Sequence, residues 1–197
     1  MRKFERHNKK RNRLPVVFPI LTIIGIGILF VLSSFYEKSW TYNWNGITNQ
    51  IRDSVKVAEN GGISSGVVGI EGRKPKQFDR RYWIMKNATQ LELLKLTNYP
   101  NATIKTIAYE GLLRKKDFTD KTNLVLKSLN ETEYPINFQM GCVGSRMYIS
   151  EYLIDFVLYL DIHSSPLPDG LTNRFKLTKN EVDIIMNEYR KTPNYQR

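Results

Sequence analysis

The apolar residues of the chain follow two patterns, an unbroken run near the N-terminus and a helical spacing over the second half. The run covers residues 14–36 and contains no charged side chain in 23 positions. As a helix it would be about 34 Å long, which exceeds the about 30 Å of a bilayer's hydrocarbon core. The pattern therefore predicts a transmembrane anchor over residues 14–36.

Basic residues precede this run and favour one orientation of the anchor. Residues 1–13 carry seven Lys or Arg side chains against Glu5 alone. Such a flank places the N-terminus in the cytoplasm. We therefore expect an inner (cytoplasmic) membrane protein, single-pass, with a cytoplasmic tail at residues 1–13 and a periplasmic C-terminal domain. The alternative is a cleaved signal peptide, although such apolar regions are only about 7–15 residues long.

Between the anchor and residue 76 the pattern weakens. Residues 37–75 are typical of a connector, in which Ile47, Ile51, Val55 and Ala58 form a narrow apolar stripe of one possible short helix.

From residue 76 onward, apolar positions recur every three to four residues and predict a helical domain over residues 76–191, followed by a flexible tail at 192–197. Two capping boxes mark helix starts, Thr89 with Glu92 and Thr178 with Glu181. The predicted helices cover residues 76–86, 90–97, 101–115, 121–129 and 136–140, then a stretch that opens near Ser150, and a last helix after Thr178.

Residues 91–113 resemble a HEAT-type repeat. One predicted helix ends before Pro100-Asn101, and the next carries Ala108 and Leu112 at the repeat's apolar positions, with Lys105 where the repeat often has Arg. The whole chain resembles the membrane-anchored HEAT-like proteins of Bacteroidota, whose role is uncertain. The resemblance implies a mainly α fold, with one N-terminal transmembrane helix followed by a small α-solenoid in the cell envelope. It supplies no catalytic residues.

Charge and cysteine content exclude several partners. The net charge is +11, but residues 1–13 account for +6 of it, so only +5 remains for the rest of the chain. We therefore expect no nucleic acid partner. Cys142 is the only cysteine, so it forms no intramolecular disulfide and belongs to no Cys/His zinc cluster. We expect no metal and no cofactor.

Two sets of residues are candidates for catalysis. In one interpretation, Cys142 and His163 form a dyad in which the imidazole generates a thiolate. In the other, Cys142 is a small buried thiol and His163 is a loop histidine. A second set of carboxylates would supply acid–base pairs, or else cover a solvated helix face. That set is Glu131, Glu133, Glu151 and Asp155. The second interpretation is favoured in both cases, so we expect no catalytic residues.

A basic and aromatic segment is a candidate binding surface for lipid head groups or an acidic glycan. Its residues are Arg73, Lys74, Lys76, Arg80, Arg81 and Trp83, interleaved with Phe78 and Tyr82. The alternative is that the aromatic side chains enter the core while the charges remain solvated.

These patterns favour a non-enzymatic, membrane-anchored protein-binding or scaffolding module in the bacterial cell envelope, with a protein partner there. A narrower alternative is an immunity protein against an envelope toxin. A different alternative is an envelope hydrolase that uses Cys142 or the paired carboxylates. The sequence indicates no oligomeric state.

Overall fold

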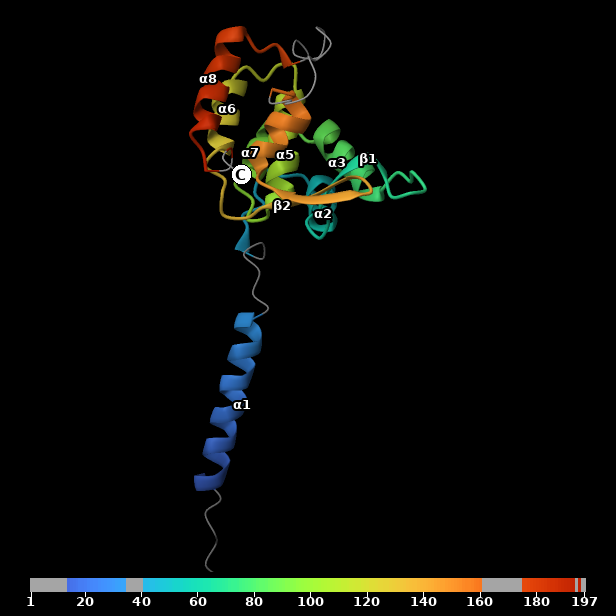
Figure 1. Cartoon of the computed structure of the whole chain (residues 1–197). Helices are drawn as coiled ribbons and strands as arrows, with labels where there is room; N and C mark the ends of the chain where they lie inside the picture. The colour runs from blue at the N-terminus through green and yellow to red at the C-terminus, as the bar shows by residue number, and fades with distance from the viewer. Residues whose placement is uncertain (1–13, 35–40, 161–174, 194, 196–197) are drawn as a thin grey trace, which may run out of the picture. The chain divides into compact units, whose positions relative to one another are not determined.

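The computed structural model describes residues 14–34, 41–160, 175–193 and 195 (Figure 1). The chain divides into two compact units, residues 1–41 and residues 42–197. Predictions that fall on the basic tail at 1–13, on His163 and on most of the loop before residue 175 lie outside the described residues.

The first unit contains one helix, α1 (Leu14–Ser34), in the predicted apolar run. In the described part of the chain, no helix is both long enough and apolar enough to cross a membrane. This finding corrects the prediction of a transmembrane anchor over residues 14–36, and with it the prediction of an inner-membrane protein with a periplasmic domain.

Helix α5 (Ala102–Arg114) lies at the centre of the second unit and is buried along nearly its whole length. It packs against α3, α4, α6 and the π-helical segment η2. Helices α6 and α8 lie side by side (Figure 1). The other helices are α2 (Asn49–Ala58), α3 (Lys76–Asn87), α4 (Gln90–Leu96), α6 (Lys121–Ser128), α7 (Ile149–Glu151), η2 (Tyr152–Leu158) and α8 (Lys179–Arg190).

Local capping chemistry explains several of these helix starts. The Thr89 hydroxyl accepts from the amide of Glu92, and the Glu92 carboxylate accepts from the amide of Thr89. Thr178 and Glu181 form the same reciprocal pair at the start of α8. Both predicted capping boxes are confirmed.

A three-stranded sheet covers one side of the second unit. Strand β1 (Ile63–Val68) pairs in parallel with β2 (Ile136–Gly141), which pairs antiparallel with β3 (Val143–Met147). In β2, Ile136 and Phe138 are buried while Asn137 and Gln139 are exposed. This alternation is the period of a strand, so the predicted helix over residues 136–140 is wrong.

The sheet also corrects the predicted α-solenoid. In a solenoid, each repeat contacts only its neighbours along the chain. Here β1 pairs with β2 across an intervening segment that contains α3, α4, α5 and α6. The fold is mainly helical, but the parallel pair of β1 and β2 joins segments that are far apart in the chain. The stretch predicted as a connector contributes α2 and β1 to this packed unit, with Ile51, Val55 and Ile63 in its core.

Candidate functional site

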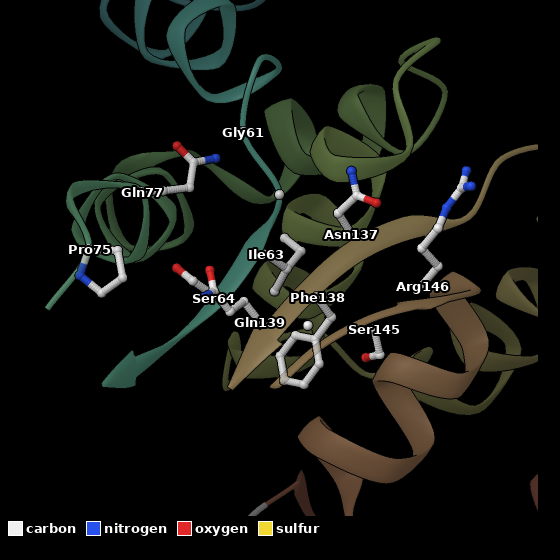
Figure 2. A pocket seen from close by; sticks show the side chains of 12 residues that line it. Gly61, Ile63, Ser64, Pro75, Gln77, Asn137, Phe138, Gln139, Ser145 and Arg146 are labelled. Atoms are coloured by element: carbon white, nitrogen blue, oxygen red, sulfur yellow. The ribbon is translucent and has the colours of Figure 1, made fainter. Parts of the chain in front are cut away.

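The outer face of the sheet carries a pocket of about 470 Å³, which we call the sheet pocket (Figure 2). All three strands and the start of α3 contribute to it. Its lining residues are Gly61, Gly62, Ile63, Ser64, Pro75, Gln77, Asn137, Phe138, Gln139, Gly144, Ser145 and Arg146. None of them is acidic, and Arg146 carries the one charge among them.

Strand register determines which side chains face this pocket. Asn137 of β2 is the register partner of Arg146 of β3, and Phe138 is the partner of Ser145. Partners in an antiparallel pair lie on the same side of the sheet. Figure 2 shows Asn137 and Arg146 pointing to one side, and Phe138 and Ser145 to the other. Phe138 packs into the core, with its ring centroid 4.5 Å from that of Phe156.

Ser64 is the buried polar residue of the sheet pocket. It is 8% exposed, and its hydroxyl has no hydrogen-bond partner among the described residues. Gln139, whose side chain is exposed, is its register partner on β2. A buried hydroxyl without a partner is costly, at about 1–3 kcal/mol. Ser64 therefore brings an unpaired polar group to the wall of the sheet pocket.

The turn that leads into β1 is held in place by three side chains from other elements. Gln77 donates to the carbonyl oxygen of Ala58 at 2.9 Å, and Thr103 donates to that of Gly61 at 2.9 Å. Asn101 donates to the carbonyl oxygen of Glu59 at 3.2 Å. This turn forms one wall of the sheet pocket, so the wall is preformed.

Gly62 allows β1 to lie close to β2. A Cβ atom at this position would lie 2.4 Å from the carbonyl oxygen of Asn137. The absence of a side chain is therefore required for the strand pairing beside the pocket.

Strand β3 forms an open edge of the sheet. The strand order is β1-β2-β3, and no described strand pairs with the outer side of β3. A two-residue turn at Gly141 and Cys142 joins β2 to β3, and Gly141 has the positive φ, 57°, that such hairpin turns require. Two apolar side chains beside this turn are exposed, Met140 by 51% and Val143 by 69%.

Of the candidate catalytic residues, the structure describes Cys142 and the four carboxylates. Cys142 is exposed in the hairpin turn, and His163 lies outside the described residues. Glu151 accepts a hydrogen bond from the amide of Tyr148 at 2.6 Å, and Glu131 pairs with Lys105. Among the described residues, no group of three His, Cys, Asp or Glu side chains is placed to hold a metal ion.

The other two candidate carboxylates also lie apart from the sheet pocket. Asp155 belongs to η2, and Glu133 lies in the exposed turn before β2. Neither lines the pocket.

The candidate basic surface is divided between solvent and core. Arg73, Lys74, Lys76 and Trp83 are exposed, and Arg80 is half-buried with a bond to Gln77 at 3.1 Å. Lys74 pairs with Asp79. Arg81 is only 5% exposed and lies in the core. These side chains therefore do not form one continuous surface.

Arg81 belongs to a buried charged network. It donates to the Tyr152 hydroxyl at 2.8 Å, and that hydroxyl donates to Glu110 at 3.0 Å. Arg114 donates to the other oxygen of Glu110 at 2.8 Å. Burial, and then the charge of Glu110, raise the pKa of Tyr152 well above its ordinary value. The network joins α3, α5 and η2, so its position indicates a structural role.

Sequence reasoning missed the polar residues of the sheet pocket, including Ser64, Asn137 and Gln139. The alternation of buried Ile136 and Phe138 with exposed Asn137 and Gln139 is the signal that identifies β2. No local signal pairs β2 with β1, because that contact is long-range.

Three comparisons with known proteins give no relative. No protein-family model, no curated protein and no solved structure matches the chain.

Proposed function

We propose that residues 42–197 form a non-enzymatic protein-binding module. The partner lays an extended segment along the open edge of β3 and inserts a polar side chain into the sheet pocket. The envelope setting is not part of this proposal, because no described helix is suited to cross a membrane. The observation that carries the proposal is the open edge of β3 beside a pocket whose lining is polar and has no acidic residue.

The open strand edge supports a peptide segment as the ligand. An edge strand presents unpaired N–H and C=O groups, and an added strand satisfies them. The exposed side chains of Met140 and Val143 offer apolar contacts at one end of that edge. Backbone pairing would supply affinity, and the sheet pocket would supply specificity.

The lining of the sheet pocket supports a polar or acidic side chain as the group inserted. The amides of Gln77, Asn137 and Gln139 both donate and accept hydrogen bonds, and Arg146 only donates. With no carboxylate among the lining residues, an inserted Asp or Glu meets donors without a competing negative charge.

A selection from a phage-displayed peptide library tests this proposal. The library is panned against the full chain, and the affinity of the selected peptides is measured by fluorescence polarisation. We expect the variant Asn137→Ala/Gln139→Ala to weaken binding at least about tenfold, since it removes two hydrogen-bonding side chains. Both side chains are exposed, so the fold should remain intact.

The matched control removes the same two side-chain types from another surface. Asn49 and Gln50 are exposed at the start of α2 and lie outside the sheet pocket. The variant Asn49→Ala/Gln50→Ala should bind the selected peptides as tightly as the wild type. Equal affinity for both double variants, or a selection that yields no saturable peptide, would overturn the proposal.

A further inference from the structure

A second pocket, of about 380 Å³, lies among α3, α5, α6 and the turn before α8, and we call it the basic pocket. Four cations line it: Arg114, Lys116, Lys121 and Lys176. Tyr82, Leu113 and Phe175 complete the lining. This pocket shares no residue with the sheet pocket, so the two sites are distinct.

No carboxylate is among the lining residues of the basic pocket. Glu110, which is not among these lining residues, accepts hydrogen bonds from Arg114 at 2.8 Å and from Tyr152 at 3.0 Å. Asp120 precedes Lys121 and accepts a hydrogen bond from Asn123 at 2.6 Å. Three lysines therefore line one cavity, and none of its described lining residues is acidic.

Lys121 is in the least favourable position of the three lysines. Its side chain is buried, with 7% of the residue exposed, and donates to the carbonyl oxygen of Phe175 at 2.9 Å. It is also the first residue of α6, where the partial positive charge of the helix end repels a cation. Burial, and then the charge of Lys176, lower the pKa of Lys121. A bound anion would offset the burial of the Lys121 ammonium, the repulsion from the helix end and the charge of Lys176.

We propose that the basic pocket binds a phosphate group, either inorganic phosphate or the phosphate of a small metabolite. Lysine ammonium groups act as point charges toward phosphate, and the guanidinium of Arg114 adds directional donors. Arg114 contacts Glu110 through Nε and Nη2, which leaves Nη1 for another acceptor. The volume of about 380 Å³ admits a small phosphorylated molecule.

Titration of the full chain with inorganic phosphate, followed by heteronuclear NMR at constant ionic strength, tests this site. We expect saturable shifts of the backbone amides of Lys116, Lys121 and Lys176. The variant Lys116→Gln/Lys176→Gln replaces two exposed pocket lysines and should weaken phosphate binding at least about tenfold.

The control Lys56→Gln/Lys86→Gln removes the same charge from exposed positions outside the basic pocket. It should bind phosphate like the wild type. Titration with a phosphate monoester then distinguishes the two sources, because a metabolite site binds the monoester more tightly than inorganic phosphate. Linear, unsaturable shifts, or equal weakening in both double variants, would overturn the proposal, since either result indicates only general screening of a basic protein.

Discussion

Replacing Gly62 by alanine should destabilise the chain by disturbing the strand pair that supports the sheet pocket. The new Cβ atom would lie 2.4 Å from the carbonyl oxygen of Asn137 and 3.2 Å from its Cβ atom. Real Cβ atoms essentially never approach another heavy atom within 3.0 Å. The oxygen belongs to the backbone of β2, which is paired on both sides, so it cannot turn away as a flexible side chain would.

The strain must therefore be relieved by moving the start of β1 away from β2. Overpacking of this kind costs about 1–3 kcal/mol, and the backbone contact places Gly62→Ala in the upper half of that range, at about 2–3 kcal/mol. Urea unfolding of the full chain, followed by circular dichroism, measures the free energy of unfolding and its slope with denaturant. We expect the free energy to fall while the slope stays constant.

Gly144→Ala is the matched control, since Gly144 lies in β3 and a Cβ atom there would meet no atom within 4 Å. Its unfolding free energy should change by less than about 0.5 kcal/mol. If Gly62→Ala lost no more stability than Gly144→Ala, then β1 and β2 would not lie as close as described, and the wall of the sheet pocket would be misplaced.

Two further predictions concern buried charge. Arg81→Met removes one cation from the buried network, while Arg114 remains paired with Glu110. The free energy of unfolding, measured in guanidinium chloride, should fall by about 2–3 kcal/mol. A loss below about 1 kcal/mol would contradict a structural role for Arg81. Burial tends to raise the pKa of Glu92, but hydrogen bonds from Thr48 and Thr89 outweigh burial and lower that pKa. The ionised Glu92 carboxylate therefore stabilises the fold at neutral pH. This stabilisation is lost as the pH falls through the lowered pKa. Glu92→Gln should therefore be less stable than the wild type at pH 7, by about 1–3 kcal/mol. The difference should shrink as the pH falls through the lowered pKa of Glu92, and a difference independent of pH would refute this assignment.

The helices that the sequence predicted carry their own local signals. Thr89 with Glu92, and Thr178 with Glu181, satisfy the first amides of α4 and α8 through residues only three positions apart. Contacts of this range can be read from spacing alone.

The sheet and its pocket depend on contacts that spacing does not encode. Ile63 pairs with Phe138, which lies 75 positions later in the chain. Short strands such as β2 carry only two or three alternations, so a short helix fits the same letters. Ser64 becomes a candidate only when β1 and β2 are placed side by side, and Arg81 is removed from the predicted surface only when Glu110 and Tyr152 are found beside it.

Amide hydrogen exchange at β3 is the most direct test of the proposed protein-binding function. The full chain is measured by NMR with and without a selected peptide at saturating concentration. If the peptide adds a strand, alternate amides of residues 143–147 should exchange at least about tenfold more slowly when it is bound, while the amides of α8 keep their rates. Saturable peptide binding without any added protection along β3 would contradict the account.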